Sequence, residues 1–191
     1  MKILRYKEAG YEEAIMGMSL SYYYEGDDLE EWWKTAQTKA SKVAKLLSKK
    51  EASHSKFLRA ISCWITIRAS RSWWQEMDQY KVATTSLSAS TMHTLAKRPI
   101  TQENFATPIL GVYLDYLNRC KEEEDIQSFK EQLPEGYLQT RMIHCNYATL
   151  RTIIAQRHDH RLPNWQTFIK QVMDKVEHPE LLEGVQNDYR I

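Results

Sequence analysis

The sequence predicts a small α/β domain that contains more helix than strand. Several segments alternate apolar and polar residues and are rich in β-branched and aromatic side chains, as strands are. Between them lie longer segments whose apolar residues recur at helical spacing. Only 6 glycines and 5 prolines occur in 191 residues, so few turns are expected. This length suits a single domain spanning residues 1–191.

The composition argues against a strongly charged protein and against a membrane-spanning one. The net charge is only +1, so the protein as a whole is not attracted to nucleic acid or to membranes. The content of 42% hydrophobic and 27% charged residues is ordinary for a globular protein. No apolar run approaches the roughly 18 residues of a spanning helix. The N-terminus becomes polar too early for a secretory signal. The cysteines show no CxxC spacing, so we expect reduced thiols in a cytoplasmic protein.

The N-terminal quarter predicts one strand and two helices. Residues 1–6 alternate as a short strand does, and residues 11–24 carry apolar side chains at helical spacing. Residues 26–50 form the clearest helix, because Asp27 and Asp28 stand where the helix dipole favours negative charge and lysines gather at the far end. The apolar stripe expected on this helix consists of Trp32, Ala36, Ala40, Val43 and Leu47.

The middle of the chain predicts a central strand followed by shorter elements. Residues 57–70 are β-branched, aromatic and alternating, which favours a buried central strand. Residues 70–80 are typical of a short helix, and residues 80–86 fit a further strand. Residues 87–98 are rich in serine and threonine, which fits either a turn or a helix start.

Two helical segments are predicted next. Residues 101–125 have helical spacing, with an interruption expected at Pro108 and Gly111. Residues 126–136 should form a helix that ends in a turn. The side chains expected on the buried side of the first segment are Ile109, Tyr113, Tyr116 and Cys120.

The last third predicts a strand followed directly by a helix. Residues 137–145 alternate as a strand, and residues 146–157 have helical spacing. Pro163 stands where a last helix would begin, so residues 164–182 are expected to be helical. The tail, residues 183–191, is expected to be a loose end.

Amide and guanidinium groups gather around this strand–helix unit. Arg141 lies in the strand, Asn146 at the corner and Arg157 at the helix end. Asn146 and Arg157 share one side of the helix, whereas Arg151 is expected to be solvated. An asparagine between a strand and a helix can cap the helix or bind the edge of a base or flavin ring. The guanidinium of an arginine can bind two oxygens of one phosphate group at once. The pattern therefore fits either an anion site or a capped helix with solvated arginines.

No metal site is expected. His158 and His160 flank Asp159 just after a helix end, and this i, i+2 spacing is poor for a tetrahedral site with no second ligand pair nearby. These residues are predicted to be polar turn residues at a helix C-terminus.

Residues 133–165, LPEGYLQTRMIHCNYATLRTIIAQRHDHRLPNW, resemble the C-terminal half of the flavin-dependent thymidylate synthases. In that family a strand leads to Asn-Ala-Arg-Ser-Leu and then to a helix ending in Leu-Arg. Asn146 and Leu150 match the asparagine and the leucine, and Arg157 matches the helix-end arginine. Ala148 stands where the family motif has its arginine.

A second, upstream resemblance concerns the signature of that family, Arg-His-Arg-x-x-Ser-x-Asn-x-x-Ser-x-Arg-Tyr. Its best placement is on QYKVATTSLSASTM, residues 79–92. Lys81 retains one cation and Thr84 one hydroxyl. The other signature positions hold Gln79, Tyr80, Ser86, Ala89, Thr91 and Met92. The whole resemblance covers roughly residues 57–177.

The resemblance implies a small sheet flanked by helices, FAD as cofactor and a pyrimidine nucleotide as ligand. It implies that flavin is held by Arg141, Asn146 and Arg157. It implies a nucleotide phosphate near Lys81, Thr84, Ser86 and Ser88. It also implies a homo-oligomer, a tetramer in the family. The chain further resembles divergent phage and prophage relatives, which would place it in the host cell cytoplasm.

Two functions follow as hypotheses. One is a flavin-dependent, methyltransferase-like enzyme acting on a nucleotide. The other is a phage-type protein that keeps the fold without the chemistry and binds a host protein, for example a defence protein, or a nucleotide signal. Replacing Arg-His-Arg by Gln-Tyr-Lys removes positive charge and favours binding over catalysis. Nucleic-acid binding through Lys42, Lys45 and Lys49 is a third idea, which the net charge of +1 disfavours.

Overall fold

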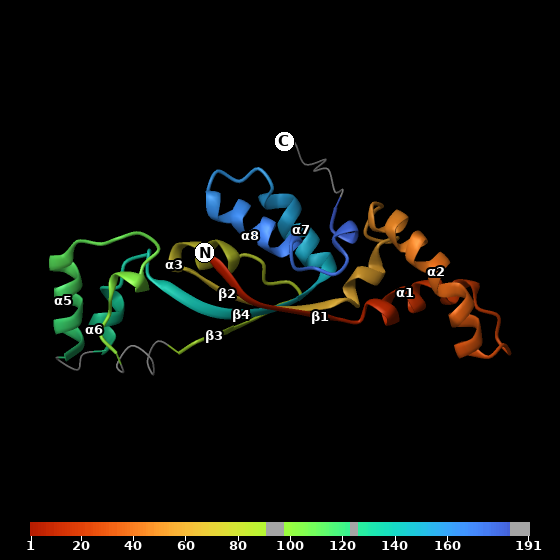
Figure 1. Ribbon diagram of the computed structural model, residues 1–191, viewed down its shortest axis with the longest axis horizontal. Helices are drawn as coiled ribbons and strands as arrows, with labels where there is room; N and C mark the ends of the chain where they lie inside the picture. The colour runs from red at the N-terminus through yellow and green to blue at the C-terminus, as the bar shows by residue number, and fades with distance from the viewer. Residues whose placement is uncertain (91–97, 123–125, 184–191) are drawn as a thin grey trace.

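The centre of the molecule is a four-stranded antiparallel sheet in the order β1–β2–β4–β3. The computed structural model describes residues 1–90, 98–122 and 126–183 (Figure 1). Its strands are β1 (Lys2–Ala9), β2 (Ser62–Ser70), β3 (Thr84–Ser88) and β4 (Leu138–Asn146). The predicted central strand is confirmed as β2, although it begins only at Ser62. Of the ambiguous segment 87–98, residues 91–97 lie outside the described residues.

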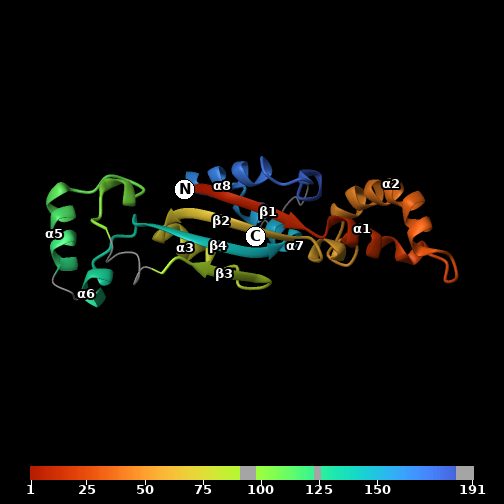
Figure 2. The ribbon, with the colours of Figure 1, turned by 60° about the horizontal axis from the view of Figure 1, so that its bottom comes forward.

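Helices cover one face of this sheet and extend from both ends of it. The α-helices are α1 (Tyr11–Ser19), α2 (Leu29–Ser48), α3 (Arg71–Met77), α5 (Gly111–Glu122), α6 (Ile126–Glu131), α7 (Tyr147–Arg157) and α8 (Pro163–Met173). Short 3₁₀ helices are η1 (Leu20–Tyr22), η2 (Lys56–Arg59), η4 (Gln102–Asn104) and η5 (Pro179–Leu181). Helices α3, α7 and α8 lie over the sheet, with α1 and α2 at one end and α5 and α6 at the other (Figures 1 and 2). The predicted α/β fold with more helix than strand is confirmed.

The covered face of the sheet carries the main hydrophobic core. Its residues in β2 are fully buried and alternate along the strand: Cys63, Ile65, Ile67 and Ala69. In β1 a bulge between Ile3 and Arg5 shifts the alternation by one residue. Ile3, Tyr6 and Glu8 consequently all face the helices, and Glu8 lies directly opposite Cys63.

Two of the cysteines that are distant in sequence meet in this core. Cys63 and Cys145 face each other across β2 and β4, with their Sγ atoms 3.4 Å apart. Both are free thiols and both are buried. The hydrogen bond to Cys145, together with burial, raises the pKa of Cys63. Cys63 is therefore a buried thiol that is hydrogen-bonded to Cys145.

A second, smaller core lies beneath α5 and α6. It consists of Ile100, Phe105, Leu117, Phe129, Leu133 and Tyr137. The prediction of helix from residue 101 is wrong before Gly111, where α5 begins, because Pro108 has no N–H to continue a helix. The predicted burial of Tyr116 is also wrong, since Tyr116 is 38% exposed and Leu117 is fully buried.

The most deeply buried side of α2 coincides only partly with the predicted stripe, in which Trp32, Ala36 and Leu47 are partly buried against the main core. Its buried residues are Trp33, Ala40, Ala44 and Ser48, and only Ala40 belongs to the expected stripe. The indole Nε1 of Trp33 donates to Glu12 Oε1 of α1 at 2.9 Å, which fixes this side toward α1. Trp32, Val43 and Leu47 also line a groove of about 390 Å³ beside α1.

The C-terminal part follows the prediction up to Met173. The last helix, α8, starts at Pro163 and stops at Met173, so the predicted helical stretch up to residue 182 is too long. A short 3₁₀ helix, η5, follows. Of the predicted loose tail, residues 184–191 lie outside the described residues. Among the described helices, none combines the length and the apolar character needed to cross a bilayer.

We expect Gly10→Ala to destabilise the fold. Gly10 precedes α1 with φ of 92°, and an added Cβ would lie 2.6 Å from the backbone oxygen of Ala60. Left-handed strain and this clash together should lower the free energy of unfolding by about 2–3 kcal/mol. Urea denaturation measures the loss. Gly17→Ala is the matched control: no atom lies within 4 Å of its Cβ position inside α1, so a gain of up to about 1 kcal/mol is expected. Equal effects of the two substitutions would contradict this explanation.

Candidate functional site

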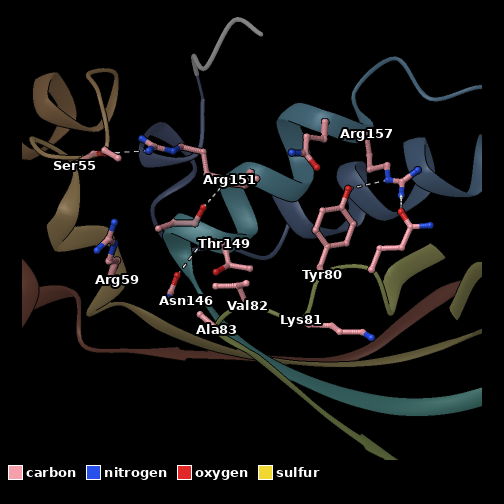
Figure 3. Close-up of a pocket in the computed structure, with 15 residues that line it drawn as sticks. Ser55, Arg59, Tyr80, Lys81, Val82, Ala83, Asn146, Thr149, Arg151 and Arg157 are labelled. Atoms are coloured by element: carbon pink, nitrogen blue, oxygen red, sulfur yellow. Dashed lines mark hydrogen bonds between the residues drawn. The ribbon is translucent and has the colours of Figure 1, made fainter. Parts of the chain in front are cut away.

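A cavity of about 970 Å³ opens at the corner between β4 and α7 (Figure 3). Three segments form its walls: the η2 region, the loop after α3, and helix α7 from its first turn to its last. The lining residues are Ala52, Ser55, Arg59, Gln79, Tyr80, Lys81, Val82, Ala83, Asn146, Ala148, Thr149, Arg151, Thr152, Gln156 and Arg157. Four of these residues are cationic, and neither aspartate nor glutamate is among them. This volume lies within the usual range of about 300–1,000 Å³ for small-molecule sites.

Asn146 forms the corner itself. It is the last residue of β4 and the N-cap of α7, and its Oδ1 accepts the N–H of Thr149 at 2.9 Å. Within the described residues, no donor or acceptor partner is assigned to its Nδ2, which is therefore available to a ligand. The first turn of α7 also lines the cavity and brings the positive end of the helix dipole to it. The predicted cap and the predicted ligand site thus coincide at one residue.

Arg157 joins the far end of α7 to the loop after α3. Its Nε donates to Tyr80 Oη at 2.8 Å, and its Nη2 donates to Gln79 Oε1 at 3.3 Å. Its Nη1 lies 3.3 Å from Glu76 Oε2 in an ion pair. The guanidinium also lies 4.6 Å from the ring centre of Trp165. Arg157 lines the cavity, but each of its three guanidinium nitrogens already donates a hydrogen bond to a protein side chain.

The carboxylate of Glu76 ties the neighbouring turn into the same network. Its Oε2 accepts Trp165 Nε1 at 2.7 Å and lies 3.5 Å from His160 Nε2. His158 instead pairs with Asp159 at 2.8 Å. The two histidines therefore face different partners, as residues of a polar turn do.

Arg151 is not solvated, and the prediction for it is wrong. It is 9% exposed, and it donates to the backbone oxygen of Ser48 and, at 3.0 Å, to Ser55 Oγ. Its burial lowers the pKa of its guanidinium. Arg151 therefore fastens α7 to the end of α2, and spacing along α7 could not reveal this because the partners come from distant segments.

Arg59 and Lys81 are the cavity cations that remain free. Both are exposed, and in residues 1–90, 98–122 and 126–183 neither side chain has a hydrogen-bond or ion-pair partner. Arg59 comes from η2 and Lys81 from the loop that precedes β3. An unpaired cation on a cavity without carboxylates attracts anions. The sequence pointed to Lys81 but not to Arg59, which falls within the predicted strand 57–70 and belongs instead to η2, ahead of β2.

The backbone beside Lys81 is also unusual. Ala83 has φ of 53°, and it is the one non-glycine residue with positive φ among those described. The left-handed conformation costs alanine roughly 1 kcal/mol. Backbone strain of this kind concentrates at ligand-binding and catalytic loops.

Arg141 and the predicted hydroxyl residues lie outside the cavity. Arg141 forms an ion pair with Asp78 at 3.0 Å, donates to Gln139 at 2.9 Å, and stacks over Trp74. The sheet register sets Ser88 opposite Arg141, and Ser86 and Thr84 follow along β3. Arg141 is five residues from Asn146, or roughly 17 Å along a strand. The structure thus brings Lys81, Asn146 and Arg157 together, and it places Arg141, Thr84, Ser86 and Ser88 along the β3–β4 edge.

The fold itself is that of the flavin-dependent thymidylate synthases. The Helicobacter pylori enzyme complexed with FAD and dUMP superposes with a TM-score of 0.72 over 96% of this chain and 98% of that chain, at 18% identity. A UMP/dUMP methylase from Streptomyces cacaoi bound with 5-Br UMP superposes with a TM-score of 0.62 over 91% and 86%, at 11% identity. No protein-family model and no curated protein matches the sequence. The likeness therefore establishes the fold and leaves the ligand to be argued from the site.

We expect Arg157→Lys to destabilise the protein by about 1.5–3 kcal/mol, because an ammonium cannot reproduce the fork that reaches Tyr80, Glu76 and Gln79. Chemical denaturation monitored by tryptophan fluorescence measures the change. Arg161→Lys, on an exposed residue one turn beyond, should stay within about 0.5 kcal/mol. A tolerated lysine at 157 would mean that the network does not hold the end of α7.

Proposed function

We propose that this protein binds a phosphate-bearing nucleotide ligand, FAD or a pyrimidine nucleotide, in the cavity at the β4–α7 corner. The observation that carries the proposal is the pair of cations, Arg59 and Lys81, which have no side-chain partner among the described residues and lie on a cavity to which no described residue contributes a carboxylate. A phosphate placed between them would form charge-assisted hydrogen bonds, which are about twice as strong as neutral ones. Asn146 Nδ2 would donate to a carbonyl or ring nitrogen of the attached base or flavin.

The likeness of fold supports the same ligand class. The neighbours are described in complex with FAD and dUMP and with 5-Br UMP, and each of these ligands carries phosphate. The loop that provides Lys81 is also the one onto which the family signature is placed, so the resemblance and the geometry converge on one segment.

Binding without synthase turnover is the form of this function that the cavity supports best. Two of the three signature positions that hold Arg-His-Arg in the family are occupied here by the neutral residues Gln79 and Tyr80. Both of their side chains accept from Arg157, so they serve the protein itself rather than a ligand. One cation, Lys81, is left where the family has a cationic cluster. A phage origin and a host-protein partner stay predictions from sequence resemblance.

We further propose that the chain forms a homo-oligomer. Helices lie on one face of the sheet (Figure 1). The opposite face carries the stacked pair Trp64 and His144, whose ring centres are 4.8 Å apart. Leu4 and Leu87 are 49% and 58% exposed. A second copy that covers this face would remove that apolar surface from water. Light scattering coupled to size-exclusion chromatography would measure the mass of the assembly.

Replacing both free cations should weaken binding strongly. We expect Arg59→Met combined with Lys81→Met to weaken FAD and dUMP binding about 100-fold or more, because each lost charge-assisted contact contributes roughly 1.5–3 kcal/mol and two contacts are lost. Calorimetric titration measures both ligands, and the oxidised flavin band at roughly 450 nm reports FAD independently. Affinity of the wild type should also fall as salt rises.

The control for this experiment is Lys45→Met, which removes an exposed lysine from α2. Its affinities should equal those of the wild type. Wild-type protein that binds neither FAD nor dUMP would overturn the proposal, and so would undiminished binding by the double variant.

A further inference from the structure

A separate cluster of potential metal ligands lies at the β1 edge of the sheet. Glu8, Glu177 and His178 each offer one ligand atom, and these atoms lie within 4.8 Å of one another. Glu8 is near the end of β1, whereas the other two belong to the segment between α8 and η5. None of the three lines the cavity at the β4–α7 corner, so the cluster is independent of the function proposed above.

We propose that Glu8, Glu177 and His178 form a binding site for a divalent first-row transition-metal ion such as Zn²⁺. Carboxylate and imidazole are ligands that Zn²⁺ accepts, and three protein ligands leave a position for water. The ion would fasten the edge strand to the C-terminal segment, two parts of the chain about 170 residues apart.

The carboxylate of Glu8 is held in place by one oxygen only. Its Oε2 accepts from Tyr6 Oη at 2.5 Å, from Tyr147 Oη at 2.7 Å and from the backbone N–H of Glu177 at 3.2 Å. Two phenol hydroxyls and one backbone N–H therefore all donate to the same carboxylate oxygen. These three hydrogen bonds fix the position of the carboxylate.

The other oxygen of Glu8, Oε1, is buried and has no hydrogen-bond partner in the described part of the chain, which indicates that a cation could bind there. A buried carboxylate oxygen without a partner is costly, and such atoms are few in native proteins. The orphaned oxygen belongs to the same carboxylate whose other oxygen is fixed by three donors, so a bound cation would satisfy it without disturbing the existing bonds.

The charge of the cluster also favours a cation. Two carboxylates approach each other here, and neither Glu8 nor Glu177 forms an ion pair with lysine or arginine among the residues described. Like charges at this separation repel each other strongly when one of them is partly buried. A divalent ion between them would replace that repulsion by attraction.

The imidazole of His178 is oriented by two neighbours. Its ring stacks on Tyr11 with centroids 3.4 Å apart and an interplanar angle of 11°. Its Nδ1 lies 3.6 Å from Glu180 Oε1. Metal-binding histidines commonly direct one ring nitrogen to a carboxylate and ligate with the other, which fixes the tautomer. Tyr11 and Glu180 thus occupy the places of a supporting outer shell.

Closing the site requires only a small movement. Donor atoms around a tetrahedral Zn²⁺ with bonds of about 2.0–2.1 Å lie roughly 3.3 Å apart. Glu177 is exposed, so rotation of its side chain brings its carboxylate to the other two ligands at little cost. The mixed carboxylate and imidazole set disfavours Mg²⁺ and Ca²⁺, which prefer ligand shells made of oxygen.

The test is zinc binding and thermal unfolding of the full chain. Protein stripped with a chelator and dialysed against Zn²⁺ should retain close to one ion per chain by elemental analysis. Zinc in excess should raise the unfolding midpoint by about 5 °C or more, because it binds the native state, whereas Mg²⁺ should leave it unchanged.

Glu177→Gln and His178→Gln should each weaken zinc binding at least tenfold and abolish the thermal shift. Because Glu177 is exposed, its variant should fold normally, and Glu131→Gln on the distant α6 is the matched control. The absence of stoichiometric zinc in the wild type would overturn the proposal. Zinc binding that both variants retain would also overturn it, and would point to another site such as the His158–His160 turn.

Discussion

The hydrogen-bonded fork of Arg157 is the interaction on which the cavity depends. It connects the last turn of α7 to Tyr80, Glu76 and Gln79, and so fixes the loop that carries Lys81. At the other end of α7, the cap made by Asn146 fixes where the helix starts. With both ends of α7 held, the space between the helix, the loop and η2 keeps its shape without a ligand.

The cations of the cavity therefore divide into two kinds. Arg151 and Arg157 are bonded to the protein and maintain the walls. Arg59 and Lys81 have no partners among the described residues and provide the positive charge that an anion would meet. The guanidinium of Arg157 thus serves the architecture, whereas Arg59 and Lys81 carry the charge that is free to meet a ligand.

The sequence was most informative where local pattern and tertiary structure agree. The alternation in residues 57–70 and 137–145 predicted β2 and β4, and the position of Asn146 predicted the corner. The sequence pattern failed where contacts with a distant segment determine which side chains are buried. Arg151 is buried because it donates hydrogen bonds to Ser48 and Ser55. The buried side of α2 is set by its contact with α1. Arg59 enters the cavity only because η2 packs near α7, and the grouping of Glu8 with His178 joins opposite ends of the chain.

A crystal structure of the protein grown with dUMP tests the cavity most directly. We expect the phosphate within hydrogen-bonding distance of Arg59 or Lys81, with the Arg157 fork unchanged and Asn146 still capping α7. A phosphate bound instead along the β3–β4 edge beside Ser88 and Arg141, with the cavity empty, would contradict the assignment of the site. It would show that the β3–β4 edge, and not the free cations of the corner, holds the ligand.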